Sequence, residues 1–224
     1  EESKPEQEIY SPKNRMQFER GKDGNLIGHT REVQVATGKF DDKGKPIFET
    51  REYDHNPEIA NSFENYMDLA EKKYGVPRVD INVFARTDNK RSKQISNEYE
   101  KMKNDPQNPV VKSAYEKMSE EMMDQYQTLM DDGWRFDFYP RNEKGDPVDP
   151  YGNPRNALED MRENKHLYVY PTNDGFGTSD DFDASTSPLL ALSGENFGGE
   201  DAFLNDIFRA VHDVFGHGME EVGF

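Results

Sequence analysis

The chain has 224 residues, of which 33% are apolar, 33% are charged and 12% are aromatic, and it contains no cysteine. This length allows one large folded domain, and the aromatic residues and nine methionines can supply the large side chains of its core. The formal net charge of −17 disfavours binding to nucleic acid or to anionic lipid, and the lack of cysteine excludes disulfides and thiolate metal ligands.

The first half of the chain predicts an arm, a hairpin and two helices. Residues 1–30 are polar and rich in turn signals, so they are predicted to form an N-terminal arm with little core. Strand-like runs at residues 32–36 and 47–51 flank a turn and predict a β-hairpin. Apolar residues at steps of three and four predict a helix that Gly75 ends and a longer helix over residues 109–132. Residues 79–83 predict a strand, and the charged stretch that follows suits a surface connection or a short helix.

The second half predicts short strands at residues 134–139 and 166–170, with a short helix through Leu158 and Met161 between them. Residues 171–199 are rich in Gly, Ser, Asp and Thr and predict a long loop, and a final amphipathic helix is predicted to begin near Glu200. We therefore expect one α+β domain over residues 31–224, predominantly helical with a few short strands. We expect an extended N-terminal arm before it and a truncated C-terminal end. No apolar run is long enough to span a membrane.

Two of the five histidines, His212 and His217, stand close together near the end of the final helix. On an ideal helix, at about 100° per residue, they would lie roughly 140° apart, which is too wide for one ion. Gly216 and Gly218 permit a bend or a helix end, so both imidazoles can turn toward one point. Two histidines and a carboxylate suit non-heme iron(II), with zinc as the alternative metal. The alternative reading is a half-buried helix histidine and a second histidine that interacts with the helix dipole.

The string His212-Asp213-Val214-Phe215-Gly216-His217 resembles the H-[DE]-x-[FL]-G-H iron motif of the pterin-dependent aromatic amino acid hydroxylases. The resemblance implies that His212 and His217 bind iron and that a glutamate farther along the chain completes the site. It also implies a supporting catalytic role for Asp213, as a carboxylate that orients an imidazole. The preceding Asp206-Ile207 step departs from that family, because it lies farther from the first histidine.

Residues 205–213 and 215–217, together with residues 166–171 and 175–177, resemble a family of large tailed-phage proteins. The resemblance extends over most of residues 30–224 and implies a phage-encoded protein in the host cytoplasm or the virion. It also implies that the domain continues into a segment with a glutamate. Within this chain, Glu221 is the predicted third ligand, because it lies four residues after His217; a solvated surface carboxylate is the alternative.

These observations predict an iron(II) protein that resembles non-heme oxygenases and acts on an unknown small-molecule substrate. The first alternative is a structural virion component or interaction module that contacts other phage proteins without catalysis. The second is a metal-dependent hydrolase, since His212-Asp213 resembles the metal-binding pair of the histidine-aspartate phosphohydrolases. His29, His55 and His166 have no recognisable ligand spacing, so no role is predicted for them.

Overall fold

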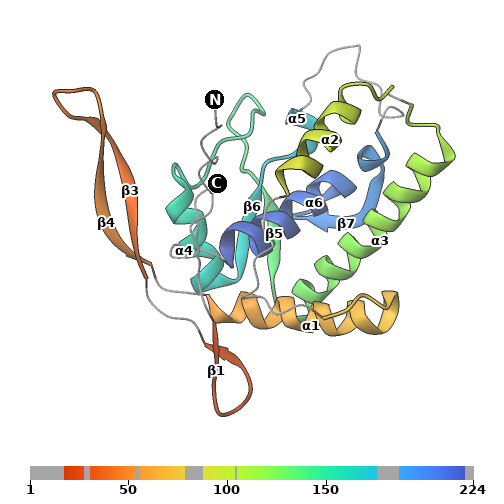
Figure 1. The fold of residues 1–224 in the computed structure, drawn as a ribbon, viewed down its shortest axis with the longest axis horizontal. Coiled ribbons are helices and arrows are strands. Elements are labelled where there is room, and N and C mark those ends of the chain that lie inside the picture. Colours follow the sequence, from red (N-terminus) through yellow and green to blue (C-terminus); the bar gives the residue numbers. More distant parts are fainter. Residues whose placement is uncertain are drawn as a thin grey trace.

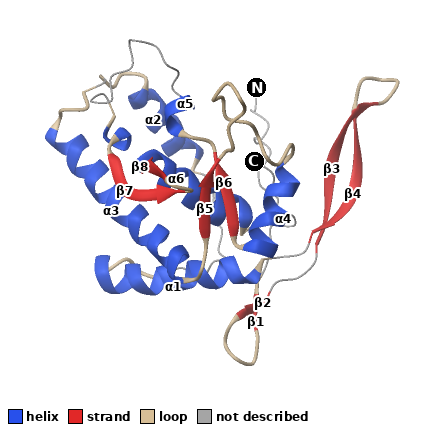
Figure 2. Ribbon diagram, turned by 180° about the vertical axis from the view of Figure 1, so that it is seen from behind, coloured by secondary structure: helices blue, strands red, loops and turns tan. Residues whose placement is uncertain are grey.

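The computed structural model describes six segments of the chain, which are residues 18–27, 31–53, 56–78, 88–103, 105–175 and 187–219. Helices predominate in these segments, and the strands form small two-stranded sheets (Figures 1 and 2). The predicted α+β class, helical with a few short strands, is therefore confirmed. The strand predicted at residues 79–83 and the candidate ligand Glu221 lie outside the described residues.

Two antiparallel hairpins open the described chain. β1 (Glu19–Arg20) pairs with β2 (Leu26–Ile27), and β3 (Arg31–Phe40) pairs with β4 (Pro46–Tyr53). The second hairpin confirms the predicted one, and it projects away from the helices in Figure 1. The first lies inside the predicted arm but packs on the domain, since Phe18 and Leu26 belong to the hydrophobic core. This differs from the expectation that residues 1–30 add little to the core.

Helix α1 (Pro57–Tyr74) shows why the sequence predicts its ends well. The Asn56 side chain accepts a hydrogen bond from the backbone N–H of Ile59, and proline occupies the first helical position. Gly75 adopts the left-handed conformation, with φ 68°, and donates to the carbonyl of Glu71. Such a cap favours glycine, so the helix ends where the periodic pattern ends.

Helices α2 (Asn89–Tyr99) and α3 (Pro109–Asp131) follow, and they differ in burial. No residue of α2 is buried, whereas α3 buries Met122, Tyr126 and Leu129. Gly133, with φ 87°, follows α3 and leads into β5 (Arg135–Phe138). The predicted long helix and the strand after it are therefore confirmed.

β5 pairs in parallel with β6 (His166–Val169), and α4 (Pro154–Asn164) connects the two strands. After β6 come the short helix α5 (Thr172–Gly175) and a 3₁₀ turn, η3 (Pro188–Leu190). β7 (Leu192–Phe197) and β8 (Glu200–Phe203) then form an antiparallel pair. The prediction of a loop up to residue 199 missed β7, because its alternating burial is carried by small and polar residues.

The final helix, α6 (Leu204–His212), begins four residues later than predicted, because residues 200–203 pair with β7. It continues into η4 (Asp213–Gly218), a π-helical turn. Both pack into the main core, where aromatic side chains meet aliphatic residues of the helices; its largest fully buried members are Trp134, Tyr126, Phe197, Ile59, Leu129, Met161, Leu167, Ile207 and Val214. The core therefore lies directly behind the predicted histidine pair.

Candidate metal centre

A buried carboxylate fixes the start of the helix that carries the histidines. Asp206 is fully buried, and its Oδ2 accepts a hydrogen bond from the backbone N–H of Phe203 at 2.9 Å. Its Oδ1 accepts from the backbone N–H and the hydroxyl of Thr172, at 2.8 and 2.5 Å. A buried charge needs such partners, and here they tie the first turn of α6 to the start of α5.

The buried apolar residues of α6 and η4 determine which side of this helix faces solvent. Ile207, Ala210, Val211 and Val214 are buried, whereas His212 is exposed. Asp213 and His217 are half-buried. Because the buried stripe is held in the core, the side with the polar side chains is left at the surface of the domain.

The π-helical turn brings the two histidines together. The backbone N–H of Met219 donates to the carbonyl of Val214, five residues earlier, at 2.9 Å. This wider turn places residues five apart nearly above one another, so His212 and His217 share one side of the helix. The sequence predicted a bend or a helix end here. The structure achieves the same convergence with a π turn inside a continuous helix.

Gly218 allows this turn to pack on its neighbours. A Cβ atom at Gly218 would lie 2.7 Å from Met161 Sδ of α4 and 2.9 Å from Ile59 Cδ1 of α1. Both distances are shorter than a non-bonded contact permits. The glycine therefore lets the turn approach α1 and α4, and this contact sets the position of His217 next to it.

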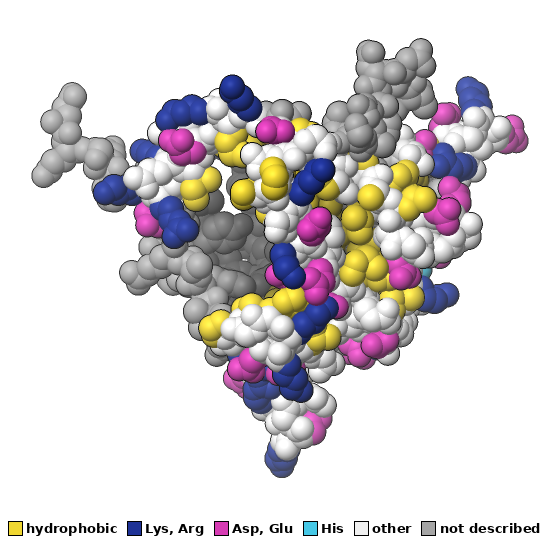
Figure 3. Space-filling model, turned by 90° about the vertical axis from the view of Figure 1, so that its right-hand side faces the viewer, with side chains coloured by type: hydrophobic (Ala, Val, Ile, Leu, Met, Phe, Trp, Pro, Cys, Tyr) yellow, Lys and Arg dark blue, Asp and Glu magenta, His cyan; other side chains and the backbone are white. Residues whose placement is uncertain are grey.

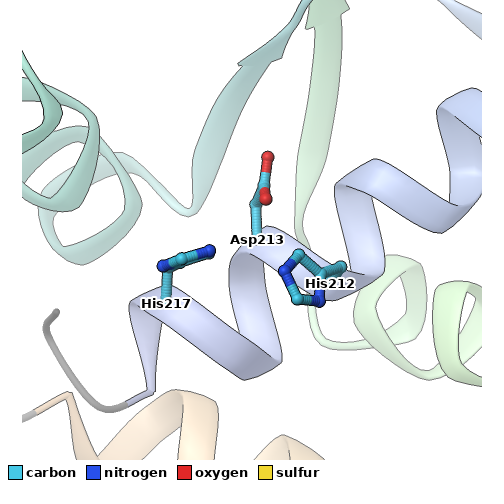
Figure 4. Close-up of side chains that lie close together, drawn as sticks. All are labelled: His212, Asp213 and His217. Atoms are coloured by element: carbon cyan, nitrogen blue, oxygen red, sulfur yellow. The ribbon is translucent and has the colours of Figure 1, made fainter. Parts of the chain in front are cut away.

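His212, Asp213 and His217 form a compact group of potential ligands. One ligand atom from each lies within 4.8 Å of the others, and the rings of the two histidines are 5.1 Å apart at an angle of 85°. In Figure 4 the Asp213 side chain starts from the helix between the two histidines, and its carboxylate points away from the helix, above both imidazole rings. Donor atoms bound to one ion at about 2.1 Å would lie about 3 Å apart at right angles. Two imidazoles and one carboxylate are a donor set that fits a divalent metal.

The His212 ring already has a defined plane. It stacks on Phe208, with 5.9 Å between ring centroids and an angle of 9°. Gly216 faces the same ring, where a Cβ atom would lie 3.4 Å from Cε1. The imidazole thus lies between an aromatic face and a bare stretch of backbone, which restricts its orientation without occupying its nitrogens.

Burial raises the pKa of the Asp213 carboxyl, and the positive charges of His217, His212 and Arg209 oppose this shift. Without a cation, the ionised carboxylate is therefore costly in this position. A bound divalent ion would remove that cost by direct coordination.

The structure adds Asp213 to the potential ligands of the site. The sequence resemblance implies an orienting role for Asp213, and the four-residue spacing to His217 predicts Glu221 as the third ligand; in the structure the carboxylate of Asp213 lies within the group of potential ligands. The four-residue spacing of Asp213 and His217 could have indicated this. Glu221 lies outside the described residues and stays a prediction.

His166 belongs to a separate buried network that the sequence did not predict. Its Nδ1 lies 2.6 Å from Asp160 Oδ2 and its Nε2 lies 3.0 Å from Asp137 Oδ2. Tyr151 donates to the same Asp160 oxygen at 2.7 Å. Both ring nitrogens are thus occupied by carboxylates, so this histidine ties β5, α4 and β6 together. Its partners lie 6 and 29 residues away, a spacing that matches no ligand motif.

No protein-family model, no curated protein and no solved structure matches this chain. The resemblances to the hydroxylase motif and to tailed-phage proteins therefore stay predictions from the sequence. Among the described residues, no helix has both the length and the apolar composition of a membrane span.

Proposed function

We propose that this chain is a metal-binding domain in which His212, His217 and Asp213 hold one iron(II) ion and support oxygenase-type chemistry. The observation that carries the proposal is the convergence of two imidazoles and one carboxylate, with ligand atoms within 4.8 Å of one another. Two histidines and one carboxylate on one face of an ion are the donor set of non-heme iron(II) oxygenases, and they leave other positions open.

The chain's own residues would perform three tasks. The two imidazoles bind through neutral nitrogens, and Asp213 supplies the negative charge that a divalent ion requires. Phe208 and Gly216 keep the His212 ring in a fixed plane. The exposure of His212 leaves one side of the site open to small molecules. When bound, iron would supply the oxygen chemistry, which side chains alone cannot perform.

The proposal is tested by loading the purified chain anaerobically with iron(II) and measuring bound metal per chain. We expect about one ion in the wild type, and loss of this ion in His212→Ala/His217→Ala and in Asp213→Ala. A double variant that removes two other imidazoles, His29→Ala/His55→Ala, is the matched control and should retain the metal. Equal iron in all four proteins, or none in the wild type, would refute the site.

The hydrolase alternative uses the same residues with zinc, so metal identity and activity separate it from the oxygenase proposal. A competition between iron(II) and zinc shows which ion the site prefers. Oxygen consumption by the iron form, absent in Asp213→Ala, supports oxygenase chemistry. Phosphoester hydrolysis by the zinc form without oxygen consumption supports the hydrolase alternative.

One observation favours the structural or interaction alternative. Helix α2 buries no residue, and Ile95, Tyr99 and the nearby Met102 are 60%, 72% and 66% exposed. Figure 3 shows hydrophobic side chains scattered between charges on one side of the molecule. An interaction module would retain its binding partner after the histidines are replaced, whereas an iron enzyme would lose its activity. The phage origin and the virion location rest on the sequence resemblance alone.

A further inference from the structure

Arg209 lies one helical turn before His212 and Asp213. Residues three and four apart share one face of an α-helix, so its side chain lies on the same side as the metal group. Its positive charge acts on the Asp213 carboxyl and on the Tyr139 hydroxyl. A guanidinium is therefore placed at the edge of the proposed metal centre.

The contacts of Arg209 leave most of its hydrogen-bonding capacity unused. Its Nη1 donates to the carbonyl of Tyr170 at 2.7 Å, and within the described segments no carboxylate lies within ion-pair distance. Asp174 is nearby in the chain, but Arg141 holds both of its oxygens, at 3.2 and 2.9 Å. A guanidinium has five donors, so Arg209 retains a free edge that can bind an anion with two parallel hydrogen bonds.

The backbone at Gly175 and the carbonyl of Tyr170 hold the half-buried Arg209 in place. A Cβ atom at Gly175 would lie 3.4 Å from Nη2, so the bare backbone there lets the guanidinium approach closely. Tyr170 contacts Tyr139 edge to face, with 5.5 Å between the ring centroids, and Tyr170 is 39% exposed. In a chain with 45 acidic and 28 basic residues, an arginine that has no carboxylate partner among the described residues stands out as a site for a ligand.

We infer that Arg209 binds the anionic group, carboxylate or phosphate, of a small-molecule ligand whose other end reaches the metal centre at His212, Asp213 and His217. This inference rests on the proposed metal site, because the ion must neutralise Asp213 before an anion can approach. Arg209 supplies the fork-shaped donor pair, and the rings of Tyr139 and Tyr170 form the neighbouring wall. The ligand class is thus a small anion-bearing molecule.

The test uses the full chain loaded with cobalt(II), whose visible spectrum reports metal loading, and isothermal titration calorimetry then reports anion binding. The wild type, Arg209→Gln, Arg209→Lys and the control Arg20→Gln are titrated at constant ionic strength with acetate, inorganic phosphate and uncharged acetamide. Arg20 lies on the β1–β2 hairpin, where it pairs with Glu64 at the surface. Cobalt loading is measured first, and it also shows that each variant is folded.

We expect the wild type and Arg20→Gln to bind acetate or phosphate, and to bind acetamide at least tenfold more weakly. Arg209→Gln should load cobalt normally and lose about tenfold or more in anion affinity, with Arg209→Lys in between because it keeps the charge and loses the fork. Whichever of acetate and phosphate binds more tightly shows whether the site prefers a carboxylate or a phosphate group.

Three results would overturn the inference. Equal anion affinity in the wild type and Arg209→Gln, with cobalt bound, refutes the role of Arg209 and leaves the metal site intact. Equal affinity for acetate and acetamide, with phosphate unbound, refutes anion recognition. Failure of the wild type to bind cobalt refutes the proposed function, and the inference falls with it. If Arg209→Gln does not load cobalt, the anion affinity of Arg209→Lys is compared with that of the wild type. Equal affinity in these two proteins then refutes the role of Arg209.

Discussion

At the scale of single residues, two glycines of the π turn have different tasks. Gly218 faces the buried side chains of Met161 and Ile59, one or both of which would have to shift to admit a Cβ atom, and Gly216 faces the exposed His212 ring, where a Cβ atom would make an ordinary contact. One glycine is therefore required by packing and the other is not. This difference yields a matched pair of variants.

Gly218→Ala should destabilise the protein by about 1–3 kcal/mol, because the added methyl group must push the turn away from α1 and α4. Gly216→Ala should change the free energy of unfolding by less than about 0.5 kcal/mol. Urea unfolding of both variants beside the wild type measures the difference. Equal midpoints for all three proteins would show that the turn does not pack as described.

The carboxylate of Asp213 is proposed to bind the metal, but its burial destabilises the metal-free fold when it is ionised. Burial raises the pKa of its carboxyl in the folded, metal-free protein. When the pKa of a carboxyl is higher in the folded protein than in the unfolded chain, the fold is most stable at low pH, where the carboxyl is protonated in both. Stability falls as the pH rises and the unfolded chain ionises more readily than the folded one.

Asp213→Asn should therefore make the metal-free protein more stable than the wild type at neutral pH, since the amide is never charged. The same change should remove the stabilisation that added metal gives. Thermal unfolding with and without iron(II) under anaerobic conditions measures both effects. A variant that is less stable than the wild type without metal and still stabilised by iron would contradict this account.

At the scale of elements, α4 connects the network around His166 with the π turn that carries His217. Asp160 of α4 holds His166 of β6, and the next residue, Met161, packs against Gly218 of the π turn. The network around His166 therefore holds the helix that supports the turn below His217. This makes Asp160 a structural support for the proposed metal centre.

Burial tends to raise the pKa of Asp160, but hydrogen bonds from Tyr151, His166 and Asn164 outweigh it and lower that pKa. A lowered carboxyl pKa stabilises the fold above the ordinary carboxyl range, and this contribution is lost as the pH falls through the folded value. Asp160→Asn should lower the free energy of unfolding by about 1–3 kcal/mol at pH 7. The loss should become smaller as the solution is acidified below pH 3.8.

Unfolding by urea across this pH range measures the effect, with the exposed Asp201→Asn on β8 as the control. The difference between Asp160→Asn and the wild type should shrink on acidification, while the control stays close to the wild type throughout. A difference that is constant with pH would mean that the charge of Asp160 does not support the network.

The elements that the sequence predicted well are those with local signals. Asn56, Pro57 and Gly75 mark both ends of α1, and Gly133 marks the end of α3. β7 and β8 were missed because their pairing and the burial of Phe197 come from contacts with the rest of the core. A polar strand with little alternation of large apolar side chains has no local signal of this kind.

The candidate site was predicted only in part, because some of its features have local sequence signals and others do not. His212 and His217 stand in a short motif with two glycines, so their convergence could be predicted from spacing and backbone freedom. The π turn and the inclusion of Asp213 depend on the contacts of Gly218 with α1 and α4. The His166 network joins residues far apart in sequence, and only the folded chain brings them together.

At the scale of the whole molecule, metal binding should be coupled to stability. An ion that binds only the folded chain adds about 2.7 kcal/mol at a concentration of 100 times its dissociation constant. For a chain of this size that corresponds to a rise in melting temperature of about 5–10 °C. Calorimetry with and without iron(II) measures the rise, which should vanish in His212→Ala/His217→Ala. An equal rise in that variant would mean that the metal binds elsewhere.

If His212 and His217 bind the same ion, the X-ray absorption spectrum of the iron(II)-loaded chain should report both imidazoles. Imidazole rings bound to iron produce characteristic outer-shell scattering. We expect the scattering of two imidazoles per iron in the wild type and of one in either His212→Ala or His217→Ala. A wild-type spectrum without imidazole scattering, or one unchanged in both variants, would contradict the binding of both histidines to one ion.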